Sequence, residues 1–165
     1  MTPVSLKELS AEFEANPPAE PAAVARCQSD LKFRLPAEYV KFLEQMNGGE
    51  GFIGENYLMA WPVQDLVQSN KDYLVEEAAP ELFLFGSNGG GEAFAFDTRS
   101  FPPPIVGVPL IVISLEDAVR LAPDFDALLH TCIGRNRSFL RRIEPGPGAR
   151  SESEPPSPPR LPTAP

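Results

Sequence analysis

The clearest periodic segment of the chain spans residues 36–46 and predicts an amphipathic helix. Pro36 suits its first position, because the fixed φ of proline fits a helix and its missing N–H is not needed there. Asn47-Gly48-Gly49 follows and permits a left-handed exit. Apolar side chains recur at i, i+3, i+4 and i+7 along one face, at Tyr39, Phe42, Leu43 and Met46.

Helical spacing of apolar residues also predicts helices elsewhere. Residues 4–15 form an amphipathic pattern that ends before Pro17 and Pro18. Residues 63–74 repeat the pattern after Pro62, and the Ala-rich segment 21–30 is compatible with a short helix. Asp124 is a good N-cap for a last helix, and Gly134 is its expected stop.

Two apolar runs, residues 82–86 and 93–97, predict a β-hairpin. Between them lies Ser-Asn-Gly-Gly-Gly-Glu at 87–92, which concentrates residues that can adopt a positive φ. If Gly90 needs such a φ, its replacement by valine should impair folding. A nucleotide-binding interpretation of this glycine run is disfavoured, because a strand rather than a helix follows it and no lysine is present.

Other segments predict shorter strands and loops. Residues 57–61, 105–108 and 110–113 are rich in strand-forming side chains, and prolines stand at their ends, where strands tolerate them. Residues 31–35 form either a brief strand or an extended lead-in, and residues 51–55 are expected to be a loop. Ser114 and Asp117 are spaced for a capping box.

Composition changes sharply after residue 134. Twenty of the 165 residues are proline, and residues 145–165 contain eight of them with only Leu161 as a large apolar residue. Such a tail buries too little apolar surface to offset the entropy of ordering it, so we expect disorder. The expected organisation is one domain over residues 1–134, an Arg-rich extension over 135–144 and a Pro-rich tail over 145–165.

Negative charge is concentrated in that domain. The whole chain has a formal net charge of −9, whereas residues 1–134 carry 8 Lys and Arg against 20 Asp and Glu, or −12. A body of this charge repels phosphate backbones and disfavours nucleic-acid binding. The four arginines of 135–144 could touch an acidic partner or RNA, but folding back on the acidic body is the favoured interpretation.

Residues typical of catalytic or metal sites are scarce. His130 is the only histidine, and neither Cys27 nor Cys132 has a C-x-x-C neighbour, so zinc and redox motifs are absent. No Ser elbow accompanies His130. The N-terminal segment carries charges where a signal peptide needs an apolar run, and no apolar stretch has spanning length. We therefore expect a cytoplasmic, non-enzymatic protein without cofactor, metal or membrane contact.

The ordered motifs of the chain resemble the SUKH superfamily, the domain of Smi/Knr-like cell-wall synthesis regulators. The resemblance covers about residues 20–132. It rests on the helix and Asn-Gly-Gly turn of 35–54, on 57–61, on 65–73, on F-G-S-N-G-G-G-E-A-F-A-F-D at 85–97, and on 121–129. Asp124 stands where the family usually has serine.

This resemblance implies an α+β fold, a mainly antiparallel sheet with helices packed against it, which agrees with the pattern of elements above. It also implies no enzyme chemistry, because bacterial members resemble immunity proteins that neutralise a cognate toxin, often a nuclease. An acidic inhibitor would be steered toward a basic toxin domain. The alternative is an intracellular regulatory scaffold, as fungal relatives are.

Candidate partner-binding residues are acids beside the glycine-rich turns and the single tryptophan. Large aromatics dominate interface hot spots, although a core position is the favoured interpretation for Trp61. A monomer is favoured. The residues proposed for partner contact are Glu50, Glu55, Glu92, Asp97 and Trp61.

Overall fold

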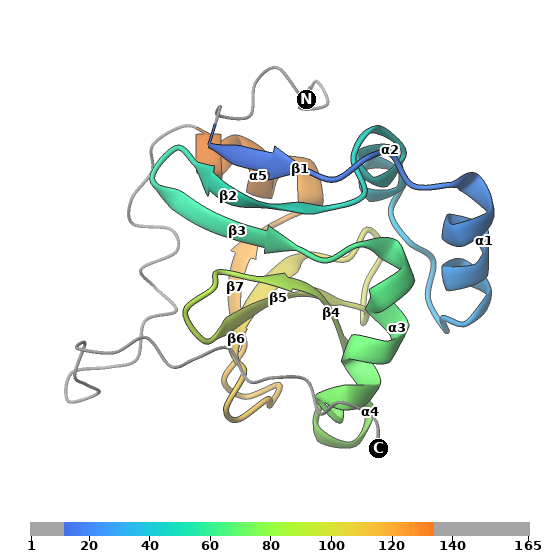
Figure 1. Ribbon diagram of the computed structural model, residues 1–165. Coiled ribbons are helices and arrows are strands. Elements are labelled where there is room, and N and C mark those ends of the chain that lie inside the picture. The colour runs from blue at the N-terminus through green and yellow to red at the C-terminus, as the bar shows by residue number, and fades with distance from the viewer. Residues whose placement is uncertain (1–11, 134–165) are drawn as a thin grey trace.

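One antiparallel sheet of seven strands organises the protein (Figure 1). The computed structural model describes residues 12–133. Each strand lies beside its neighbours in the chain, so the order in the sheet is β1-β2-β3-β4-β5-β6-β7. The strands are β1 (Phe13–Ala15), β2 (Gly49–Ile53), β3 (Asn56–Ala60), β4 (Leu82–Ser87), β5 (Glu92–Asp97), β6 (Ile105–Pro109) and β7 (Val119–Ala122).

Five helices complete the α+β fold in the described part of the chain. Three of them begin beside a proline: Pro21 is the first residue of α1, and Pro36 and Pro62 are the N-caps of α2 and α3. Pro36 was predicted to be the first residue of its helix and instead lies one position before it. Asp124 caps the last helix through a 2.8 Å hydrogen bond from the Ala127 N–H to its Oδ1. The helices are α1 (Pro21–Ser29), α2 (Ala37–Gln45), α3 (Val63–Asp72), α4 (Val75–Ala78) and α5 (Phe125–Ile133).

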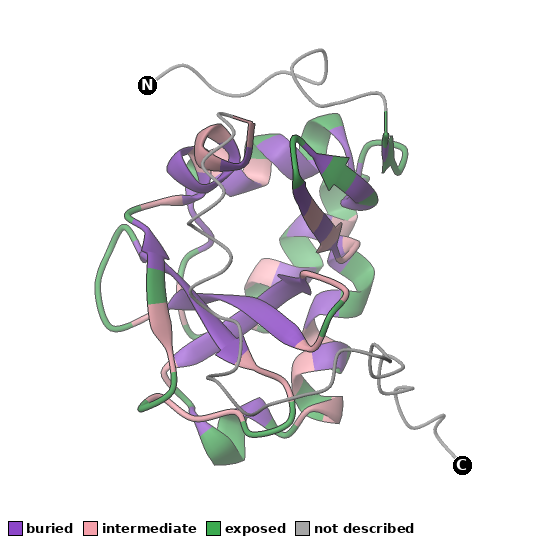
Figure 2. Ribbon diagram, turned by 90° about the vertical axis from the view of Figure 1, so that its left-hand side faces the viewer, coloured by how far each residue is buried: buried purple, intermediate pink, exposed green. Residues whose placement is uncertain are grey.

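Two hydrophobic clusters lie on opposite faces of the sheet. Figure 2 shows that the central strands between them are buried. The larger packs α1, α2 and α5 against one face around an aromatic centre formed by Tyr39, Phe85, Phe94, Phe96 and Phe125, all of which are at most 1% exposed. The smaller lies on the other face of β4–β6, under α4 and the 110–118 loop. Because both faces are covered, every residue of β4 and β5 is buried, which explains their near-continuous apolar runs.

The sheet is weakest between β3 and β4, and a side chain from α3 completes it there. These two strands pair only at Met59–Ser87 and Ala60–Gly86, after which the chain leaves for α3. Asn70 of α3 then takes the place of the missing strand: its Nδ2 donates to the Leu84 carbonyl (2.9 Å), and its Oδ1 accepts from the Leu84 N–H (2.8 Å). Both backbone groups of a fully buried β4 residue are thereby satisfied.

Three predictions about local structure need correction, and one strand was not predicted. Residues 13–15 are strand β1 and not the end of a helix, because Phe13 enters the core while β1 pairs with β2; residues 4–11 of that predicted helix lie outside the described part. Residues 51–53 are strand rather than loop. Residues 110–113 are not a strand, because β5 and β7 already occupy both edges of β6. Residues 119–122 form β7, which the sequence did not indicate.

The glycine-rich hairpin turn is confirmed, but the expectation for Gly90 is wrong. Positive φ values occur at Gly89 (+75°) and Gly91 (+101°), and not at Gly90. A Cβ on Gly90 would meet only Asn88, at 3.5 Å, whereas a Cβ on Gly89 would lie 3.1 Å from the Tyr57 ring. The turn therefore requires glycine on either side of Gly90 and leaves space at Gly90 itself.

A matched pair of substitutions tests this assignment. We expect Gly89→Ala to destabilise the fold by about 1–2 kcal/mol, because it adds left-handed backbone strain to a tight contact. Gly90→Ala should change the free energy of unfolding by less than about 0.5 kcal/mol. Urea denaturation of both variants measures the difference, and equal effects would contradict the assignment.

Candidate functional site

The outer surface of β1, β2 and β3 carries an exposed group of acidic and aromatic side chains, which we call the acidic–aromatic face. Burial alternates along β2 and β3, with glycine and apolar residues directed toward the main core. The other set is exposed or half-buried, and α5 lies behind β1 and β2 in Figure 1. The face comprises Glu14 of β1, Glu50 and Phe52 of β2, and Tyr57 and Met59 of β3.

Two carboxylates stand side by side on this face. Glu14 and Glu50 are direct cross-strand partners, and both are exposed. Like charges placed directly opposite one another disfavour strand pairing, so the arrangement does not serve the stability of the sheet. The Tyr57 hydroxyl donates a 2.7 Å hydrogen bond to Oε2 of Glu50, which fixes that carboxylate. This hydrogen bond, a small effect of burial and the charges of Glu50 and Glu14 raise the pKa of Tyr57.

An exposed aromatic ring borders the carboxylates. Phe52 is 44% exposed, pairs across the strands with Tyr57 and meets its ring edge-to-face at a centroid distance of 5.2 Å. Gly51, between Glu50 and Phe52, has a φ of +142°, and a Cβ there would overlap the Glu12 carbonyl of the neighbouring segment. The glycine of β2 thus lets the β1 segment approach closely. As a result, the exposed side chains of β1 and β2 lie on one continuous surface.

Of the residues predicted to contact a partner, Glu50 is the one that lies on this face. Glu55 is exposed in the turn between β2 and β3. Glu92 and Asp97 are at opposite ends of β5 and are only 7% and 8% exposed. The structure therefore does not bring the four acids together.

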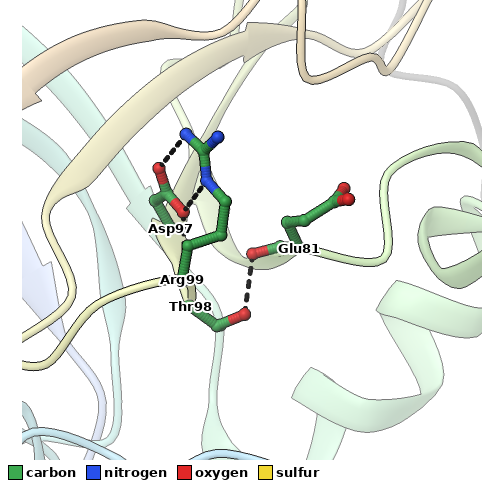
Figure 3. Close-up of polar contacts among 4 residues, drawn as sticks. All are labelled: Glu81, Asp97, Thr98 and Arg99. Atoms are coloured by element: carbon green, nitrogen blue, oxygen red, sulfur yellow. Dashed lines mark hydrogen bonds and ion pairs between the residues drawn. The ribbon is translucent and has the colours of Figure 1, made fainter.

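Asp97 is already engaged by an arginine two residues away (Figure 3). The Arg99 guanidinium donates to both carboxylate oxygens, from Nε to Oδ1 at 2.9 Å and from Nη2 to Oδ2 at 2.7 Å, and the Arg99 N–H also donates to Oδ1. This fork holds the pKa of Asp97 below its usual range. The hydroxyl of the adjacent Thr98 donates to the Glu81 carbonyl. Together with the Asp97–Arg99 ion pair, this bond anchors the loop that follows β5.

Trp61 is half-buried and belongs to the packing between the two hydrophobic clusters. Its ring lies parallel to that of Tyr73, with an interplanar angle of 4° and a centroid distance of 6.1 Å. Its backbone N–H donates to the Phe85 carbonyl. These contacts assign Trp61 a structural role where β3 passes into α3.

Four residues of the acidic–aromatic face were not among the predicted partner contacts. Glu14 fell in a segment predicted to be helical, and Phe52 fell in a predicted loop. Tyr57 and Met59 were predicted as strand residues without an assigned role. The usable signal is the alternation of Glu50, Phe52, Tyr57 and Met59 with glycine and apolar residues across a short turn, which predicts a hairpin with one exposed face.

The described residues offer no group of three or more His, Cys, Asp or Glu side chains arranged for a metal ion. Burial raises the pKa of Cys27 to about 11, with a smaller contribution from Asp30, and that of Cys132 to about 12, which disfavours the reactive thiolate form of both. No helix within residues 12–133 has the length and apolar character needed to cross a membrane.

The fold and its exposed face define a small α+β domain in which the exposed carboxylates and aromatic rings stand on one side of an antiparallel hairpin. A sequence model of the SMI1 / KNR4 family (SUKH-1) matches residues 18–131. The chain belongs to this family, as its ordered motifs predicted. No curated protein sequence matches it.

Proposed function

We propose that the protein is an immunity protein, which binds and neutralises a cognate toxin through its acidic–aromatic face. Membership of the SMI1 / KNR4 (SUKH-1) family supports a protein-binding role of the immunity or Smi/Knr type. The observation that carries the assignment to this face is the pair Glu14 and Glu50, held opposite one another at the surface beside Phe52 and Tyr57.

Charge supports a basic partner. Residues 1–134 carry a formal charge of −12, and complementary charge steers association and raises its rate. A toxin that acts on nucleic acid has a basic active site, because it must hold phosphate. The carboxylates of the face would occupy that site, while Phe52 and Tyr57 supply the aromatic contact area common in interface hot spots. We propose that this occurs in the cytoplasm, with the protein as a monomer.

Co-expression with toxins encoded beside the gene tests the immunity function. Protection of the cell and a purified complex with one of them are the expected results. Absence of both, together with stable binding to an unrelated housekeeping protein, would instead favour the regulatory scaffold. Deleting residues 145–165 separates the two functions further, since an immunity domain keeps its affinity and a bipartite adaptor loses a partner.

Charge reversal tests the face itself. We expect Glu14→Lys combined with Glu50→Lys to slow association with the toxin about tenfold at low salt and to flatten its salt dependence, because two favourable charges become repulsive. Glu44→Lys combined with Glu77→Lys, at two exposed acids on α2 and α4, is the control, because it changes the net charge by the same amount. Stopped-flow association rates for the three proteins measure the effect, and equal rates for the double variant and the control would exclude this face.

A further inference from the structure

Glu92 is a buried carboxyl group, and among residues 12–133 one of its oxygens has no hydrogen-bond partner. The residue is 7% exposed, and the oxygen without such a partner is Oε2. It is the first residue of β5 and alternates with Phe94 and Phe96, whose rings enter the main core. An ionised carboxylate in such surroundings is disfavoured, and burial raises the pKa of Glu92 to about 7.

Its described neighbours provide no compensating charge. Pro109 is its partner on β6, and Ser87 and Asn88 flank the turn on β4. Beyond that turn, β3 contributes only the neutral Tyr57. The titratable groups of α5, which packs over the same face of the sheet, are Asp126, His130 and Cys132. Burial is the sole cause of the shifted Glu92 pKa, so none of these groups balances an ionised carboxylate.

The backbone of Glu92 closes the glycine-rich turn. Its N–H donates to Asn88 Oδ1 at 3.2 Å, and its carbonyl accepts from the Asn88 N–H at 2.9 Å. The same Asn88 oxygen accepts from the Gly90 N–H at 2.8 Å. A backbone movement that carries Glu92 out of its buried position would break the hydrogen bonds that shape residues 87–92.

The closed turn lies against the acidic–aromatic face. Gly89 approaches the Tyr57 ring so closely that a Cβ at this position would lie 3.1 Å and 3.2 Å from two of its carbon atoms. Ser87 contacts the sulfur of Met59 at 3.6 Å. Tyr57 in turn donates to Glu50, so the turn forms one side of the support that positions this carboxylate.

We propose that residues 87–92 form a proton-controlled clamp on the acidic–aromatic face. With Glu92 protonated, the turn is closed against Tyr57 and the Tyr57–Glu50 hydrogen bond is held in place. Ionisation of Glu92 favours its exit from the core side of the sheet, which opens the turn and frees the Tyr57 ring. In the open form the Glu92 carboxyl has its ordinary affinity for protons, and in the closed form it has a higher one. Opening therefore increases as the pH rises through 7. Control of toxin binding by this clamp rests on the function proposed above, but the clamp itself does not.

NMR spectroscopy of the full chain tests the clamp without any partner. The side-chain carboxyl carbon of Glu92 is expected to titrate near pH 7, and the Tyr57 ring resonances should follow the same curve. Protection factors of the Gly90 and Glu92 amides, corrected for the intrinsic rate of exchange, should fall about tenfold between about pH 6 and pH 8.5. Amides of the β5–β6 ladder away from the turn, such as that of Ala95, should change little.

Glu92→Gln removes the titration, and Asp97→Asn is its control at the opposite end of the same strand. We expect the pH dependence of the Tyr57 resonances and of Gly90 protection to disappear in the first variant and to persist in the second. A Glu92 titration near 4.5 overturns the proposal. A titration near 7 that leaves Tyr57 and Gly90 unchanged overturns it as well. Both outcomes can be read from the wild-type protein, and neither bears on whether a toxin is bound.

Discussion

Phe85→Ala is expected to destabilise the fold by about 3–5 kcal/mol, which is among the largest effects of any single truncation here. Phe85 is fully buried, and its ring contacts those of Tyr39, Phe94, Phe96 and Phe125 at centroid distances of 5.6, 6.3, 4.7 and 5.7 Å. Removing it leaves a cavity between β4 and the helices α2 and α5, which these rigid rings cannot readily fill. Urea denaturation monitored by circular dichroism measures the change.

Ile111→Ala is the control for loss of apolar volume, because Ile111 is 91% exposed. Its free energy of unfolding should remain within about 0.5 kcal/mol of the wild type. Similar losses in the two variants would mean that the aromatic centre is not the principal core of the domain. An unchanged m-value is needed for the comparison, since a change in m indicates an altered denatured or native state.

Asn70→Ala should destabilise the domain by about 2–4 kcal/mol, although the residue is only half-buried. The substitution removes the side-chain amide that bonds both backbone groups of Leu84, and these groups then remain unsatisfied within the sheet. It also removes the bond from Asn70 Nδ2 to the Leu66 carbonyl. Loss of amide protection at Leu84 should accompany the loss of stability and can be followed by hydrogen exchange.

Gln68→Ala provides the matched control on the same helix. Gln68 is exposed, and its side chain bonds only that of Asp72, also at the surface, so we expect a change below about 0.5 kcal/mol. Asn70→Asp separates the two halves of the bridge, because a carboxylate still accepts from the Leu84 N–H but donates nothing to its carbonyl. A stable Asn70→Ala protein with normal protection at Leu84 would show that the amide is not a substitute for a strand.

The elements that sequence patterns predicted are those with long, one-sided or fully apolar runs. The stripe of α2 and the runs of β4 and β5 repeat over enough residues to exclude the alternatives. β1 has only three residues, so no period can be recognised. β2 contains Gly49 and Gly51, which normally argue against a strand, and it is stabilised by the close approach of β1 that these glycines permit. Both β1 and β2 are strands because they pair with each other, and residues so far apart in the chain cannot be paired from a local pattern.

Prediction of the candidate site was limited by strand register, which the sequence does not show. Acids were chosen for their proximity to glycine-rich turns, and this placed Glu50 correctly at the surface. Proximity to a turn does not determine which face of a strand a side chain occupies. Successive residues of a strand point to opposite faces, so a shift of one position moves a side chain from solvent to core. Glu92 was therefore expected at the surface and lies among buried residues, while the exposed Glu14 and Tyr57 required knowledge of strand register.

The strictly consecutive order of the sheet has a consequence for self-association. Because β1 and β7 do not pair with each other, the sheet has two edges, and unpaired backbone groups at such edges are templates for strand addition and aggregation. In the described part of the chain these edges belong to the shortest strands, β1 with three residues and β7 with four. Glu14 and Arg120 also place a charge in the middle of each edge strand. The long apolar strands β4 and β5 are confined to the interior of the sheet, so the segments most prone to form fibrils are the ones that the fold keeps from other chains.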